Sequence, residues 1–147
     1  MESIFRWQKL GKVFDPKDLN TESWMSEFAQ SPTVLIREKT VRVYFCSRPE
    51  PSPKGLYLSY VSFIDLDRKN LLKVLRVCVR PVLSLGDYGT FDEFGTYPVT
   101  VIPDGEEIRI YYAGWTRCES VPFNAAIGLA ISRDGGENFQ RLGDGPV

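Results

Sequence analysis

The sequence contains no histidine among its 147 residues. Ser-His-Asp and Cys-His catalysis are therefore excluded within this chain, and so are metal sites built on imidazole. Any acid–base chemistry near neutral pH has to come from carboxylates, tyrosine, lysine or cysteine, or from residues outside this sequence. We expect neither a metal ion nor a cofactor.

Long apolar runs and an excess of charge are also lacking. No apolar stretch approaches the roughly 20 residues needed to cross a bilayer, and the first ten residues lack the apolar core of a signal peptide. The 18 Lys and Arg residues nearly balance the 19 Asp and Glu residues. Nucleic-acid binders usually have a basic excess. We therefore expect a cytoplasmic protein that binds neither nucleic acid nor membranes.

Cysteine is scarce and irregularly placed. Cys46, Cys78 and Cys118 are odd in number and widely spaced, with no CxxC motif. This spacing favours neither a zinc site nor a disulfide framework. Free thiols in a reducing cytoplasm are the expected state.

The sequence does contain an internal repeat. The pattern of residues 32–45 returns at residues 98–112, about 66 positions later, and the Pro-Val pair at 81–82 returns at 146–147. A near-constant offset of this size indicates one supersecondary unit used repeatedly. The predicted units are residues 12–80 and 81–144, with the start of a third at 145–147.

Within each unit, apolar and polar residues alternate with a period of two, which predicts strands. Besides the two strands led by Pro32 and Pro98, the expected strands are 41–45, 56–63, 72–79, 108–112, 126–132 and 139–142. A turn is expected at Pro103–Gly105. A short helical turn is expected at Trp24–Ala29, with its N-cap among residues 20–23.

Four short antiparallel strands in each unit predict the blades of a β-propeller. The predicted fold class is all-β, with one partial propeller domain over residues 1–147. A TIM barrel would need helices between its strands, and these are missing. A β-sandwich would not repeat its long and short loops in the same order.

The segment Ser132–Phe139 matches the Asp-box pattern S-x-D-x-G-x-x-(W/F). Its Ser and Asp side chains can hydrogen-bond to the backbone of a hairpin turn, and its glycines permit positive φ. Asp134 is therefore expected to be structural rather than catalytic. Phe63–Asp67 is the expected degenerate copy of this turn in the first unit.

Asp92 and Glu93 are the candidate catalytic residues. They lie between Phe91 and Phe94 in the loop before the second Pro-led strand. Cleavage of a glycosidic bond needs an acid and a base, and neighbouring carboxylates can separate their pKa values. The alternative is an ordinary solvated acidic loop.

Arg48, Trp115 and Arg117 are candidate ligand contacts because they follow equivalent strands of the two units. A guanidinium group can bind sugar hydroxyls, a carboxylate or a phosphate, and an indole can stack on a sugar ring. The alternatives are surface cations and a tryptophan that packs between blades.

Three segments together resemble the five-bladed β-propeller glycosidases. They are A-x-x-P-T-V-L…V-Y-F…R at 29–48, F-D-E-F-G-x-x-P…I-Y-Y-A-G-W at 91–115, and A-I-G-L-A-I-S-x-D-G at 126–135. That superfamily includes arabinanases and β-xylosidases, invertases and levansucrases, and mannoside phosphorylases. The resemblance covers about residues 7–147 and implies hydrolysis or phosphorolysis of a glycosidic bond.

The resemblance also places Ser31 and Tyr97 at the ligand, directly before the strand-leading prolines. Arabinanase-like members have Asp at the position of Ser31, and the phosphorylases have Glu-Asp-Pro where this chain has Thr96-Tyr97-Pro98. Catalysis would then depend on Asp92 or Glu93 together with residues beyond Val147. The alternative is a non-catalytic carbohydrate-binding or interaction module on the same scaffold.

Two units cannot close a ring, since five units of this size would need roughly 330 residues. We expect either part of a longer protein or an assembly of several copies. Open sheet edges invite strand pairing with a neighbour. Carbohydrate and a homo-oligomer are therefore the expected partners.

Overall fold

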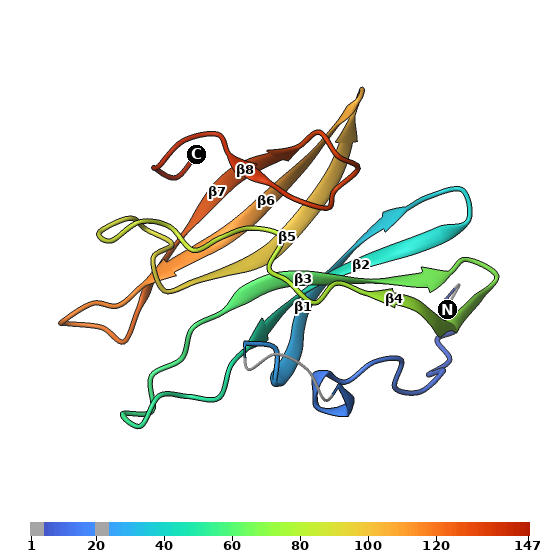
Figure 1. Ribbon diagram of the computed structural model, residues 1–147, viewed down its shortest axis with the longest axis horizontal. Coiled ribbons are helices and arrows are strands. Elements are labelled where there is room, and N and C mark those ends of the chain that lie inside the picture. The colour runs from blue at the N-terminus through green and yellow to red at the C-terminus, as the bar shows by residue number, and fades with distance from the viewer. Residues whose placement is uncertain (1–4, 20–23) are drawn as a thin grey trace.

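The computed structural model describes residues 5–19 and 24–147, and these form two four-stranded antiparallel sheets (Figure 1). The first sheet has the order β1 (Glu27–Ile36), β2 (Thr40–Arg48), β3 (Tyr60–Asp67) and β4 (Asn70–Val77). The second has the order β5 (Gly95–Asp104), β6 (Glu107–Thr116), β7 (Asn124–Ser132) and β8 (Gln140–Arg141). The predicted all-β fold with four-stranded antiparallel blades is confirmed.

The two central hairpins explain why the alternation was so clear in the sequence. β2 pairs with β3 in unbroken register from Thr40 opposite Asp67 to Ser47 opposite Tyr60. β6 pairs with β7 in the same way, from Ile108 opposite Ser132 to Thr116 opposite Asn124. Uniform pairing sends alternate side chains to opposite faces, so the pattern of two persists along each strand.

The predicted helical turn at Trp24–Ala29 is wrong. Residues from Glu27 onward belong to β1, and Ser26 N already donates to Arg48 O at 3.1 Å. Backbone pairing with β2 therefore outweighs a weak local helical signal. The predicted cap at 20–23 lies outside the described residues. Within the described ranges the one helix is the 3₁₀ turn η1 (Pro16–Asp18), capped by Asp15, and no helix there could cross a membrane.

The predicted strand at 56–63 begins later and ends later. Leu56–Leu58 are loop, and β3 runs through Phe63–Asp67, which was expected to form a degenerate Asp-box turn. That prediction is also wrong. Asp65 faces Arg42 across the β2–β3 pair, and the chain reverses only at Arg68 and Lys69.

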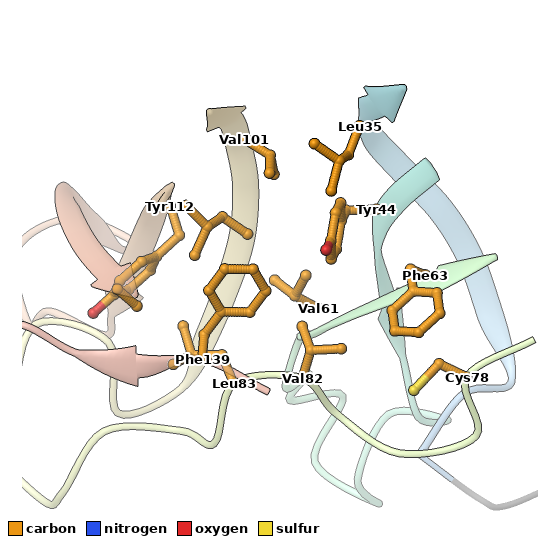
Figure 2. Packing of buried hydrophobic residues seen from close by; sticks show 12 residues of the cluster. Leu35, Tyr44, Val61, Phe63, Cys78, Val82, Leu83, Val101, Tyr112 and Phe139 are labelled. Carbon is orange, nitrogen blue, oxygen red and sulfur yellow. The ribbon is translucent and has the colours of Figure 1, made fainter. Parts of the chain in front are cut away.

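The main hydrophobic core fills the space between the two sheets (Figure 2). Val61 and Phe63 come from the first sheet, and Phe139 comes from the segment before β8. Val82, on the segment that connects the sheets, lies between them: its N donates to Val61 O at 2.9 Å, and its O accepts from Phe139 N at 2.8 Å. The connecting segment is therefore hydrogen-bonded into the core on both sides.

A smaller cluster covers the opposite face of the first sheet. Phe45 and Ile64 point into it from the sheet, and Val13 and Phe14 of the N-terminal segment pack against them. The rings of Phe14 and Phe45 have centroids 5.3 Å apart. The first sheet is thus covered on both faces.

The turn Ser132–Phe139 is held by its own side chains. Asp134 Oδ1 accepts from Ser132 Oγ at 2.6 Å and from the backbone N of Glu137 and Asn138 at 3.0 Å each. Partial burial opposes ionisation, but these hydrogen bonds outweigh it and hold the pKa of Asp134 well below its ordinary value. Gly135 and Gly136 follow with φ of 76° and 80°. This conformation turns the carbonyl groups of both glycines toward the first sheet.

Arg42 of β2 binds the Ser132–Phe139 turn through hydrogen bonds and an ion pair. Its side chain is 1% exposed and makes a bidentate ion pair with Asp65, with Nε–Oδ1 at 2.7 Å and Nη2–Oδ2 at 2.8 Å. It also donates to Gly136 O at 3.1 Å and to Glu137 Oε1 at 2.7 Å. Arg76 of β4 pairs with the same Glu137 at 2.7 Å. A partly buried network of charges, centred on the buried Arg42, therefore joins the second sheet to the first.

The network keeps Arg42 charged despite its burial. Burial by itself lowers the pKa of this guanidinium, but hydrogen bonds to Asp65 and Glu137 more than compensate, and the pKa is raised above its ordinary value. The guanidinium carbon also lies 3.5 Å from the centroid of the Phe63 ring. Hydrogen bonds and a cation–π contact together replace the lost hydration.

Replacement of Arg42 by methionine should lower the free energy of unfolding by about 3–5 kcal/mol, because it leaves the carboxylates of Asp65 and Glu137 without their buried partner. Urea denaturation followed by circular dichroism measures this loss. Arg109→Met is the matched control, since Arg109 lies at the equivalent position of β6 and its one ion pair among the described residues is with the exposed Asp104. We expect that control to cost about 1 kcal/mol or less. Equal losses in the two variants would contradict a special role for the Arg42 network.

Candidate functional site

A pocket of about 530 Å³ is lined in part by residues of the β2–β3 and β6–β7 loops. These two loops project from the same end of the two sheets (Figure 1). Both central hairpins contribute to the pocket, because β2 and β6 end there and β7 begins there. The lining residues are Arg48, Gly55, Leu56, Tyr57, Tyr97, Ala113, Trp115, Arg117, Pro122, Phe123 and Ala125. They are mainly aromatic and aliphatic, with two arginines.

Trp115 is held in place by the junction of the sheets. Its Nε1 donates to Ser59 Oγ at 2.7 Å. Ser59 is itself bound to the start of β5, since its N donates to Phe94 O at 3.2 Å and its O accepts from Thr96 N at 3.0 Å. The position of the Trp115 indole therefore depends on how the two sheets are joined at Ser59. Its ring also packs edge-on against Phe123, with centroids 6.4 Å apart.

Arg48 enters the pocket from the end of β2. Its Nη2 donates to the hydroxyl of Tyr97, and its Cζ lies between 5.2 and 5.7 Å from the ring centroids of Phe28, Tyr57 and Tyr97. Within the described structure its buried Nε has no hydrogen-bond partner. The guanidinium group is thus surrounded by aromatic rings while part of its donor capacity stays unused.

Arg117 enters the pocket from the loop after β6. Its Nη2 donates to Tyr57 O at 2.8 Å, and its Cζ lies 3.9 Å from the centroid of the Phe94 ring. The same guanidinium lies 5.9 Å from the Trp115 ring. Arg117 therefore connects the β2–β3 loop to the aromatic side of the pocket.

The structure brings together four of the five residues predicted to contact a ligand: Arg48, Tyr97, Trp115 and Arg117. Ser31 lies elsewhere. It is exposed at an irregularity of the β1–β2 pairing, with φ of 51°, a conformation that is uncommon for residues other than glycine. Its role as a ligand contact stays a prediction.

Asp92 is completely buried beneath the second sheet. Its Oδ2 accepts from Tyr112 Oη at 3.0 Å and from Arg141 Nε at 2.8 Å, and its Oδ1 accepts from Thr90 Oγ1 at 3.0 Å. Burial and the neighbouring Asp92 charge raise the pKa of Tyr112 well above its ordinary value. These contacts occupy both oxygens of Asp92 and tie the loop before β5 to β6 and β8. Its catalytic role stays a prediction.

Glu93 lies nearer to the pocket. Its Oε2 accepts from Gly89 N at 2.9 Å, and its Oε1 accepts from the hydroxyl of Thr116, which separates Trp115 from Arg117 in the sequence. The hydrogen bond from Gly89 and that from Thr116 lower the pKa of Glu93, and the charge of Arg117 acts in the same direction. An ionised carboxylate of this kind can serve as a base but is a poor proton donor at neutral pH. Its catalytic role also stays a prediction.

Sequence reasoning missed Tyr57 and Phe123, which line the pocket from the two long loops. Tyr57 was assigned to the predicted strand 56–63, and Phe123 lies outside the predicted strands. The available signal was that both loops occupy equivalent places in the two repeats, so that aromatic residues in them reach the same end of the sheets. In the described ranges no group of three or more carboxylate or cysteine side chains could hold a metal ion.

No family model matches the chain. Two uncharacterized proteins from two strains of Mycobacterium tuberculosis are each 30% identical to it over 142 residues. The alignment covers 96% of this chain and 45% of each relative. The chain therefore spans less than half the length of these curated relatives.

Solved structures of glycoside hydrolases have a similar fold. A structure from the GH130 family of mannoside phosphorylases, described as containing hydrolases that target β-1,2 mannosidic linkages in Candida mannan, has a TM-score of 0.64 at 13% identity, over 82% of this chain and 33% of that one. A family 117 glycoside hydrolase from Zobellia galactanivorans has a TM-score of 0.62 at 21% identity, over 79% and 32%. A glycosyl hydrolase from Bacteroides ovatus has a TM-score of 0.62 at 15% identity, over 82% and 32%.

These identities are low, so the likeness concerns the fold. The chain has a glycosidase-type propeller fold, and its two sheets correspond to about a third of each of these structures. The resemblance is confirmed for the fold, and membership of the glycosidase superfamily stays a prediction.

Replacement of Gly95 by alanine should destabilise the protein by about 1–3 kcal/mol, because the added methyl group would overlap the Trp115 indole and Ser59 Oγ. The change should also shift the tryptophan fluorescence spectrum, since Trp115 has to move. Thermal unfolding and emission spectra measure the two effects. Gly143→Ala is the control, because a methyl group there meets nothing within 4 Å. An unchanged spectrum in Gly95→Ala would refute the tight fit of the indole.

Proposed function

We propose that this chain is part of a glycosidase-like propeller protein and that it binds a carbohydrate in the pocket formed by Arg48, Tyr97, Trp115 and Arg117. The single observation that carries the proposal is the convergence of these four side chains in one pocket at the loop end of both sheets. The likeness of the fold to glycoside hydrolases supports it.

The chemistry of the lining suits a sugar. The flat faces of Trp115 and Phe123 can contact the apolar C–H face of a sugar ring, while guanidinium groups can donate to its hydroxyls. The volume of about 530 Å³ lies within the roughly 300–1,000 Å³ of small-molecule sites. Rigid positioning of the indole by Ser59 keeps the ordering cost of binding low.

Trp115→Ala should weaken carbohydrate binding at least about 10-fold, which corresponds to about 1.4 kcal/mol. A glycan array first identifies a ligand for the 147-residue chain, and isothermal titration calorimetry then measures affinity, because Trp115→Ala lacks the tryptophan of the pocket. Trp7→Ala is the matched control, since Trp7 is 94% exposed and lies in the N-terminal segment. Absence of binding to any glycan, or equal affinity of the two variants, would overturn the proposal.

Cleavage of a glycosidic bond, by hydrolysis or phosphorolysis, is the second candidate function. The observation that favours it is the ionised Glu93 at Thr116, next to two pocket residues. Such cleavage ordinarily uses two carboxyl groups on opposite sides of the scissile bond. None of the described lining residues is acidic, so Asp92 or a residue beyond the lining would have to supply the second group.

If the chain is catalytic, Glu93→Gln should lower turnover by about 10²–10⁴-fold while binding is retained, because it removes a proton-transfer group without removing a pocket wall. Release of nitrophenol from aryl glycosides, with and without phosphate, measures turnover. Asp92→Asn is compared after circular dichroism has established that it folds. Turnover that survives both substitutions would refute the catalytic assignment. Binding without turnover in the unsubstituted chain would select the non-catalytic module.

Assembly of several copies through open sheet edges, a cytoplasmic location and the lack of nucleic-acid partners all stay predictions. The edge strand β4 is largely exposed, which keeps strand pairing between copies physically reasonable.

A further inference from the structure

The two arginines of the pocket differ from Arg42 and Arg141 in their partners. Arg42 is buried against the carboxylate of Asp65, and Arg141 is partly buried against that of Asp92. Arg48 and Arg117 have no ion pair among the described residues, and their hydrogen bonds go to neutral groups of Tyr97 and Tyr57. The pocket therefore carries positive charge that the neighbouring protein groups do not neutralise.

Arg48 is the less compensated of the two. Its buried Nε lacks a hydrogen-bond partner within the described structure, and such an unmet donor is costly unless a ligand or water satisfies it. Among the described residues its side chain makes one hydrogen bond, to the Tyr97 hydroxyl, which leaves other donors of this pocket-lining guanidinium group without a partner there.

Two carboxylates lie near Arg117, and neither lines the pocket. Glu93 is bound to Gly89 and Thr116 and feels the charge of Arg117. Glu50 lines a neighbouring hollow together with Arg117. These two carboxylates partly offset the positive charge of Arg117 from outside the pocket lining. They leave the face that Arg48 presents to the pocket without an anionic partner.

Resting on the carbohydrate-binding function proposed above, we propose that the ligand of this pocket is an anionic sugar whose carboxylate or phosphate ester binds Arg48, with Arg117 as a second cationic contact. An oxyanion matches the planar fork of a guanidinium group and can accept two parallel hydrogen bonds. The surrounding rings of Tyr57, Tyr97 and Phe28 leave Arg48 only partly exposed, and partial removal from water strengthens this attraction. The aromatic wall at Trp115 remains available for the sugar ring.

The test compares ligands that differ in charge alone. Glucuronic-acid oligosaccharides are titrated against their carboxyl-reduced neutral counterparts, and glucose 6-phosphate against glucose, by tryptophan fluorescence with the 147-residue chain. We expect the anionic member of at least one pair to bind at least 10-fold more tightly. The carboxylate pair and the phosphate pair distinguish the two sources of the oxyanion. The preference should shrink as salt is raised from about 0.05 to 0.5 M.

Arg48→Gln should abolish the preference for the anionic ligand, because it should weaken binding of the anionic sugar by a larger factor than binding of its neutral counterpart. Arg117→Gln should reduce the preference in the same direction, and it provides a second test if Arg48→Gln does not fold. Arg80→Gln is the control for bulk charge, since Arg80 is exposed on the connecting segment, and it should keep the preference.

Three results would overturn the proposal. Equal affinity for neutral and anionic sugars would refute it and leave carbohydrate binding intact. Inorganic phosphate that binds alone as tightly as any sugar would refute it by showing a free-anion site. Absence of binding to every sugar, neutral or charged, would refute both this proposal and the carbohydrate-binding function.

Discussion

The buried ion pair between Arg42 and Asp65, completed by Glu137, is the interaction on which the arrangement of the two sheets depends. It acts across the sheet boundary, because Arg42 lies on β2 while Glu137 belongs to the turn that follows β7. Hydrogen bonds from its own residues to Asp134 hold the turn in one conformation. In that conformation its carbonyl groups accept hydrogen bonds from Arg42. These ion pairs join the sheets at one end, and the core around Val61, Val82 and Phe139 packs next to them. The pocket lies at the opposite end of the sheets.

Strand β2 therefore carries two arginines with opposite environments. Arg42 and Arg48 are an even number of residues apart, so a regular strand sends both to the same face. Arg42 pairs with carboxylates and is buried by the second sheet, whereas Arg48 contacts aromatic rings and the Tyr97 hydroxyl and has no ion pair among the described residues. The first cation has its counter-ions within the fold. Arg48 has no such counter-ion among the described residues, and this difference is the reason for proposing an anionic sugar as the ligand.

Much of the candidate site could be predicted because it depends on the repeat. Arg48 and Arg117 follow equivalent strands, so a repeated unit places them at the same end of the sheets, and Trp115 and Tyr97 come with them. The places of Asp92 and Glu93 were harder to predict, since adjacent carboxylates in one loop can lie on different sides of it. Asp92 turns inward to Arg141, while Glu93 stays near the surface at Thr116. No local pattern distinguishes these two fates.

By itself the sequence determined the all-β class, the two four-stranded units and the end of the sheets where four of the predicted ligand contacts lie, because alternation and repetition are properties of neighbouring residues. The tertiary structure alone decided which charges are neutralised. Asp65 looked like a turn residue, and it became the partner of Arg42 because β2 and β3 pair in that register. Ion pairing depends on side chains that meet across strands far apart in the chain. The unpaired charge of Arg48 is likewise visible only once its neighbours in space are known.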